Sequence, residues 1–153
     1  MTPYALARVA TAFWPLIATL PVTFAGAETL CLRVDGEERT ATFAVAVGDR
    51  VALAFTHSIY GSEVEERLRI GAGGFQPLEL RYAEQRLVEF YGHESARREN
   101  GWWVVDSSGA ELAALDLRAS QDASMRVAFR DQQISFAGHA RLSVSACPEE
   151  KHG

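Results

Sequence analysis

The sequence predicts an all-β protein, either an antiparallel β-sandwich or a partly open barrel of about 8–10 short strands. Short stretches of alternating apolar and polar residues recur at intervals of roughly 8–12 residues, and turn residues such as Gly, Asp and Pro separate them. Helix signals are weak after residue 27, and no internal repeat or linker divides the chain. We therefore expect a single domain.

The start of the chain is typical of a secretory leader. Arg8 is the only charged residue in 1–27, the stretch 9–24 is almost wholly apolar, and Ala25-Gly26-Ala27 fits a small-residue cleavage site. At about 16 residues, the apolar run is shorter than a membrane-spanning helix needs. We expect residues 1–27 to be a signal peptide, 28–147 the β-sandwich domain and 148–153 a disordered tail. The expected location is the periplasm, with membrane anchoring as the alternative if the leader is not cleaved.

The strands follow in order from the alternation of side chains and the turn residues between them. Asp35-Gly36 and residues 71–74 mark turns, and Pro77 near the start of its strand indicates an edge or a bulge. The segment 83–100 has no clean period: 84–90 fits a short helix or a strand, and 92–100 fits an exposed loop. The expected strands are 29–34, 40–47, 50–57, 62–70, 75–82, 101–106, 112–118, 125–130, 132–136 and 140–146.

The composition argues against a nucleic-acid partner. The chain has 15 basic and 20 acidic residues and a formal net charge of −5, whereas nucleic-acid-binding surfaces are basic. Neither the cysteines nor the histidines have the spacing of a zinc site. We expect no cofactor and no metal, since Glu63 and Glu65 are expected to face solvent. A metal site remains the alternative if ligands come together from His57, Glu63, Glu65, Glu66 and His93.

Two cysteines, Cys31 and Cys147, lie in the first strand and just after the last strand of the expected domain. Export would place both in an oxidising compartment, where disulfides form and persist. We expect a disulfide between them. The alternative is a pair of buried free thiols.

The segment 55–70 predicts a hairpin that carries polar groups on its apolar face. Alternation places His57 on the same face as Leu53 and Phe55, and it places Glu66 on the same face as Val64. With a turn at 58–63, Phe55 stands opposite Glu66, so His57 and Glu66 become diagonal neighbours within hydrogen-bond reach. A buried carboxylate without a partner is costly, which favours this pair.

Four residues at the turn end of this hairpin form the candidate ligand-binding site: His57, Ser58, Tyr60 and Glu66. The plain alternative is a structural corner in which the histidine and the glutamate only order the turn. A third possibility is a hydrolase with a serine nucleophile and a histidine base. Adjacent residues on a strand point to opposite faces, so Ser58 and His57 are poorly placed for it, and we assign no catalytic residue.

The run His57-Ser58-Ile59-Tyr60, followed by Val64-Glu65-Glu66, resembles a family of small bacterial extracytoplasmic proteins, a domain of unknown function. Its members are encoded beside TAXI-type TRAP transporters, which are secondary transporters with an extracytoplasmic binding protein. The family hallmark is a strand ending in His-Ser, a short turn, and a valine or tryptophan with a glutamate two positions on. That pattern carries over to His57, Ser58, Val64 and Glu66.

Further similarity to the family lies in Cys31-Leu32-Arg33-Val34, in Trp102-Trp103 and in the stretch 115–118. The chain departs from the family at Ser62-Glu63, where Thr-Pro is usual, and at 89–93, where one glycine stands in place of a Gly-Ala-Gly loop. The resemblance implies a periplasmic accessory protein of a TRAP-type uptake system. Its partner would be the permease, the substrate-binding protein or a small solute. The alternative is an interaction module with no ligand.

Overall fold

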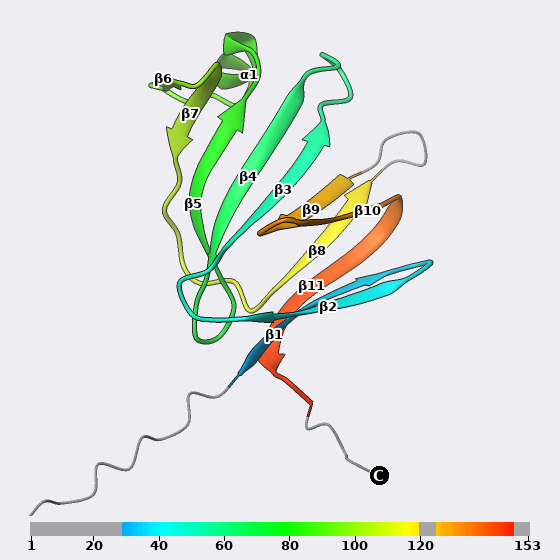
Figure 1. Ribbon diagram of the computed structural model, residues 1–153. Coiled ribbons are helices and arrows are strands. Elements are labelled where there is room, and N and C mark those ends of the chain that lie inside the picture. The colour runs from blue at the N-terminus through cyan, green and yellow to red at the C-terminus, as the bar shows by residue number, and fades with distance from the viewer. Residues whose placement is uncertain (1–28, 120–124, 149–153) are drawn as a thin grey trace, which may run out of the picture.

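The computed structural model describes residues 29–119 and 125–148. Two antiparallel sheets pack against each other, so the all-β prediction is confirmed (Figure 1). One sheet has the order β2 (Thr40–Val45), β1 (Leu30–Gly36), β11 (Gly138–Ala146) and β8 (Ala114–Ala119). The other has the order β10 (Gln132–Phe136), β9 (Met125–Phe129), β3 (Arg50–Thr56), β4 (Glu63–Ile70), β5 (Phe75–Tyr82), β7 (Trp102–Asp106) and β6 (Arg97–Glu99). Within the described ranges the sheets do not join into a barrel.

The alternation of side chains identified all ten expected strands, each to within two residues at either end. The bulge expected at Pro77 is also present, because the register between β4 and β5 shifts between Arg67 and Leu68, and Leu68 pairs with Pro77. The exposed loop expected at 92–100 is wrong in one part. β6 lies there as a short edge strand, and its Arg-Arg-Glu sequence offers no apolar alternation to detect.

The segment 84–90 forms the short helix α1 (Gln85–Phe90), one of its two expected alternatives. Only Leu87 and Val88 of the helix are buried. They pack against Val64 and Tyr82 on the inner face of the seven-stranded sheet. Two buried residues in six are too few to show a helical period, so tertiary packing decides the conformation of this segment.

Two apolar clusters lie on the inner face of the seven-stranded sheet. The larger cluster fills the space between the sheets and includes Leu32, Leu142, Leu53 and Leu68. The smaller cluster lies at the opposite end of the strands, under α1 (Figure 1). The inner face is therefore covered twice, by the four-stranded sheet at one end and by the helix at the other.

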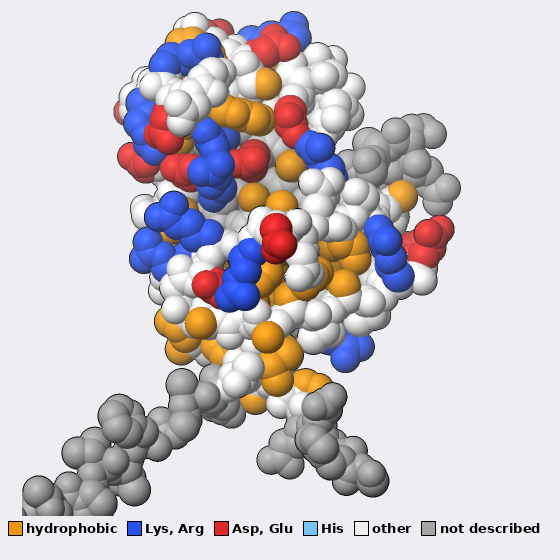
Figure 2. All heavy atoms as spheres, viewed as in Figure 1, with side chains coloured by type: hydrophobic (Ala, Val, Ile, Leu, Met, Phe, Trp, Pro, Cys, Tyr) orange, Lys and Arg blue, Asp and Glu red, His pale blue; other side chains and the backbone are white. Residues whose placement is uncertain are grey.

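Charged side chains cover the outer face of the same sheet. Glu65 accepts hydrogen bonds from Arg67 at 2.6 Å and from Arg81 at 3.3 Å. Arg81 is buried, and its guanidinium lies 5.3 Å from the Trp102 ring centroid. The Arg81 Nε lies 4.0 Å from a carboxylate oxygen of Glu79, and this Nε has no hydrogen-bond partner among the described residues. Figure 2 shows acidic and basic side chains interleaved over this part of the molecule.

The expected disulfide is present. Cys31 and Cys147 are bonded, with a Cα–Cα distance of 4.9 Å, and Cys147 donates its backbone N–H to the carbonyl of Thr29 at 2.9 Å. The bond joins residues 116 positions apart, next to the paired ends of β1 and β11. Closing so long a loop stabilises the fold by about 4–5 kcal/mol in the chain-entropy model.

The disulfide indicates a protein that functions outside the reducing cytoplasm. Of the part of the chain that the structure describes, no helix is long and apolar enough to cross a membrane. The expected signal peptide at 1–27 lies outside the described residues, and so does the expected tail at 148–153 except for its first residue, Pro148.

Candidate functional site

The turn between β3 and β4 is shorter than the sequence analysis assumed. His57 donates its backbone N–H to the carbonyl of Ser62 at 2.8 Å, and Gly61 donates to the carbonyl of His57 at 2.8 Å. Four residues, 58–61, therefore form the turn, and Gly61 occupies it with a φ of 64°. The register moves by two residues, so that Phe55 pairs with Val64 and Leu53 pairs with Glu66.

This register separates the two polar groups that were expected to pair. A shift of two residues keeps every side chain on its predicted face, and His57 is indeed buried on that face. However, His57 lies four residues along the strand from Leu53, the partner of Glu66, which is a distance of about 13 Å. The predicted pairing of Phe55 with Glu66 is wrong, and with it the diagonal contact between His57 and Glu66.

The imidazole of His57 instead supports the turn. Its Nδ1 accepts the backbone N–H groups of Ile59 at 3.3 Å and Tyr60 at 3.4 Å. Since Nδ1 is the acceptor, the neutral ring carries its proton on Nε2. The ring stacks on Tyr60 with centroids 5.3 Å apart and meets Phe90 and Tyr91 edge-on at 4.9 and 5.7 Å.

Polar contacts fasten this turn to the start of α1. The Ser62 hydroxyl donates to the Glu84 carboxylate, which also forms an ion pair with Arg86 at 2.6 Å. Arg86 donates to the carbonyl of Tyr60 at 3.3 Å, and its guanidinium lies 4.6 Å from the Tyr60 ring centroid. The hydrogen bond from Ser62, followed by the one from Arg86, holds the pKa of the Glu84 carboxyl group below its usual value. The turn and the helix thus form one unit.

A second set of rings anchors the chain after the helix. The Tyr82 hydroxyl and the His93 Nε2 are hydrogen-bonded at 2.8 Å, and Tyr91 stacks on Tyr82 with centroids 5.4 Å apart. Tyr82 is buried, and burial, with smaller contributions from Tyr91 and Glu66, raises the pKa of its hydroxyl to about 12.

The surface that results is apolar and exposed. We call it the aromatic end and define it as His57, Ile59, Tyr60, Phe90 and Tyr91. His57 forms its buried centre, while Ile59, Phe90 and Tyr91 expose 68%, 48% and 44% of their surface. Exposed large apolar side chains in contact with one another are typical of a binding surface, whereas isolated ones are not.

Glu66 lies elsewhere on the inner face, in a different environment. Its cross-strand neighbours are Leu53 on β3 and Leu80 on β5, and no hydrogen bond or ion pair joins it to another described residue. The side chain is half-buried, and burial raises the pKa of its carboxyl group. The structure thus brings together three of the four predicted site residues at the turn and leaves Glu66 apart.

Neither the hydrolase nor the metal alternative gains support from this geometry. Ser58 is exposed in the turn, and no hydrogen bond links its hydroxyl to His57. Glu63 pairs with Arg126, Glu65 with two arginines, and His93 with Tyr82. Among the described residues, no three of His, Cys, Asp and Glu are grouped as metal ligands.

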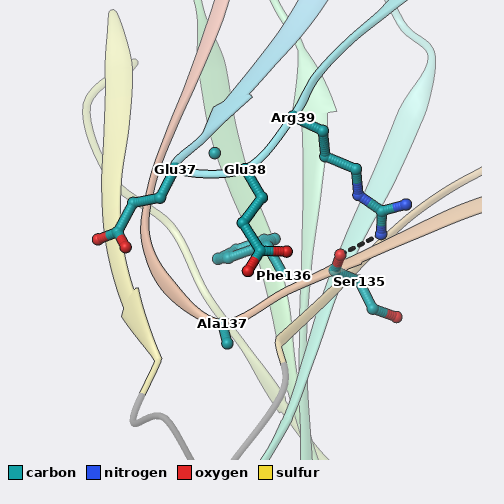
Figure 3. Close-up of a pocket in the computed structure, with 7 residues that line it drawn as sticks. Glu37, Glu38, Arg39, Ser135, Phe136 and Ala137 are labelled. Atoms are coloured by element: carbon teal, nitrogen blue, oxygen red, sulfur yellow. Dashed lines mark hydrogen bonds between the residues drawn. The ribbon is translucent and has the colours of Figure 1, made fainter.

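A cleft of about 380 Å³ lies away from these residues, between the β1–β2 turn and the β10–β11 connection (Figure 3). Arg39 reaches across it and donates to the carbonyl of Ser135, while Glu37 accepts the backbone N–H of His139 at 2.9 Å. The first of these hydrogen bonds ties the β1–β2 hairpin to β10, the edge strand of the other sheet, and the second ties it to β11 of its own sheet. The cleft contains none of the predicted site residues, and we interpret it as a corner of the sandwich.

In comparisons with known proteins, no protein-family model, no curated protein and no solved structure matches this chain. The resemblance to the transporter-linked family therefore stays a prediction.

Of the aromatic end, the hairpin pattern in the sequence selects His57 and Tyr60 but not Ile59, Phe90 or Tyr91. One signal was present: Leu87-Val88 and Phe90-Tyr91 are two apolar pairs separated only by Glu89 in an otherwise charged stretch. That pattern indicates a short element with a buried side and an exposed aromatic end.

The separation of His57 and Glu66 predicts that substitutions at the two positions act independently. His57→Ala is expected to lower the free energy of unfolding by about 1–3 kcal/mol, because two turn amides lose their acceptor. Glu66→Gln is expected to raise it at neutral pH. A carboxyl whose pKa is raised stabilises the fold only while protonated, and that stabilisation is lost as the pH rises through its folded pKa.

A double-mutant cycle by urea denaturation at neutral pH measures this independence. The coupling energy between His57→Ala and Glu66→Gln is expected to stay within about 0.5 kcal/mol of zero. A coupling energy well above 1 kcal/mol, with Glu66→Gln destabilising on its own, would show that His57 and Glu66 are hydrogen-bonded to each other after all.

The environment of Tyr82 predicts one late step in a spectrophotometric tyrosine titration. In a pH jump faster than unfolding, one phenol is expected to ionise at about pH 12, and Tyr82→Phe removes that step while Tyr60→Phe keeps it. Stability contributed by the neutral phenol is present below the ordinary tyrosine pKa of 10.0 and is lost as the pH rises to about 12. If every tyrosine of the folded protein ionises near its ordinary pKa, Tyr82 is not buried and hydrogen-bonded to His93.

Proposed function

We propose that this protein is an extracytoplasmic accessory component of a TRAP-type solute-uptake system and that its aromatic end binds another protein of that system. The partner is the transporter permease or its substrate-binding protein. The observation that carries the proposal is the exposed apolar surface of Ile59, Phe90 and Tyr91, held in place around the buried His57.

The rigidity of this surface supports a role in binding. The hydrogen bonds from Ser62 to Glu84 and from Arg86 to the carbonyl of Tyr60 join the hairpin turn to α1, and stacking of Tyr91 on Tyr82 positions the chain that leaves the helix. A pre-ordered surface loses little conformational entropy when a partner binds. Aromatic side chains on such a scaffold supply large contact areas, which is why they dominate the energetic centres of protein interfaces.

The shape of the surface favours a protein partner over a small solute. Ile59 at the tip of the turn and Phe90 at the end of α1 are large side chains that stand exposed, whereas small molecules bind in concave sites that bury most of their surface. A small solute bound at the His57 end is the second possibility. It would have to be enclosed by rearrangement of the residues that follow α1.

The disulfide supports the location that this role requires. A bond between Cys31 and Cys147 at the ends of the fold is typical of exported proteins. The leader-like residues 1–27 suit export to the periplasm. The resemblance of the His57–Glu66 hairpin to the transporter-linked family supplies the class of partner.

Mild crosslinking in the native cell envelope, followed by affinity capture of the tagged protein, tests this proposal. We expect the wild type to recover the permease or the substrate-binding protein of a TRAP-type system. The double variant Ile59→Ser, Phe90→Ser is expected to recover about one tenth of the wild-type amount of partner or less. Truncation of an apolar side chain at the centre of an interface costs about 2 kcal/mol or more of binding free energy.

Val47→Ser is the matched control for this experiment. Val47 exposes 63% of its surface, more than Phe90, but it lies beside Thr29 and Leu30 near the disulfide. Its substitution should leave recovery unchanged. Equal recovery by the wild type and the double variant, with both folded, would show that the aromatic end is not the binding surface.

A further inference from the structure

Glu66 is a charged residue to which the described part of the chain offers no hydrogen-bond or ion-pair partner. Arginines among the described residues pair with Glu63, Glu65 and Glu79, which lie on the outer face of the sheet. Glu66 points to the inner face, where its direct neighbours across the strands are Leu53 and Leu80. Its half-buried position leaves the carboxylate accessible from solvent.

The residues level with Glu66 form a row across the sheet. Pairing of β3, β4, β5 and β7 places Leu53, Glu66, Leu80 and Val105 side by side, and we call this set the Glu66 row. Leu53 belongs to the cluster between the sheets, whereas Leu80 and Val105 pack against the cluster under α1. The row is therefore the boundary between the two covered parts of the inner face.

This boundary is less completely covered than the rows beside it. Leu68 on the neighbouring row and Tyr82 on the other side expose 0% and 1% of their surface, whereas Leu80 and Val105 are only half-buried. Leu53 is covered, so the partly exposed part of the row is the stretch from Glu66 to Val105. It combines apolar contact area with one carboxylate, and a ligand site uses such a polar group to orient its ligand.

The position of Glu66 works against the stability of the folded chain. An ionised carboxylate between leucines loses hydration without gaining a partner, and burial accordingly raises its pKa. A leucine or glutamine at this position would avoid that penalty. Residues that lower the stability of a fold and have no structural role are common in functional sites.

We propose that the Glu66 row binds a small organic cation with an apolar body, such as an arylalkylamine. The ammonium group forms an ion pair with Glu66, and the apolar body lies along Leu80 and Val105. From Glu66 to Val105 the row crosses two inter-strand spacings, about 10 Å, which is the length of an aromatic ring with a short alkyl chain. The net charge of −5 favours the approach of a cation.

Binding of phenethylamine to the disulfide-bonded protein tests this site, with 2-phenylethanol as the uncharged probe of similar shape. Dissociation constants are measured by NMR titration of methyl resonances, which also locates the ligand. We expect shifts at the methyl groups of Leu80 and Val105. We also expect the wild type to bind the amine about tenfold tighter than the alcohol, an advantage that weakens as salt is added.

The variant Glu66→Gln is expected to fold and to bind the two probes equally. Glu79→Gln, which changes a carboxylate on the outer face, is the control and should keep the preference for the amine. The proposal fails if the wild type binds both probes equally, or if phenethylamine does not shift the Leu80 and Val105 methyls. The double variant Ile59→Ser, Phe90→Ser should bind the amine as the wild type does. The result for the Glu66 row is therefore independent of the result for the aromatic end.

Discussion

The four-residue turn that closes between His57 and Ser62 sets the register of the central β3–β4 hairpin, and the position of each later element depends on that register. It puts Val64 opposite Phe55, and the pairing of β4 with β5 puts Tyr82 on the other side of Val64. These side chains form the apolar face on which Leu87 and Val88 of α1 dock. Two features favour this short turn: Gly61 adopts the left-handed conformation, and His57 Nδ1 accepts the amides that the turn leaves free.

The same register creates two surfaces with different chemistry on one sheet. At the end of the hairpin, aromatic rings gather around the buried His57 and leave Ile59, Phe90 and Tyr91 exposed. Four residue pairs further along, Glu66 lies between Leu53 and Leu80. We propose a protein partner for the first surface and a small organic cation for the second. An uptake accessory that carries both would contact the transport machinery at one place and a solute at another.

The parts of the fold that follow from local periodicity could be predicted from the sequence. Alternation identified the strands and assigned His57 and Glu66 to the inner face, and the positions of Cys31 and Cys147 indicated their disulfide. Register could not be obtained in the same way, because a shift of two residues leaves every side chain on the same face and therefore leaves the hydrophobic pattern unchanged. Turn length was the missing information. The aromatic end was missed because tertiary packing, not periodicity, brings Phe90 and Tyr91 to His57.

The central claim is that the hairpin register keeps Glu66 away from His57, and cross-strand nuclear Overhauser effects between backbone protons of β3 and β4 test it most directly. The structure predicts effects that link Phe55 with Val64 and Leu53 with Glu66, together with contacts from His57 to Ser62 across the turn. Effects that link His57 with Val64 and Phe55 with Glu66 would contradict it. They would return Glu66 to the histidine and merge the two surfaces into one site.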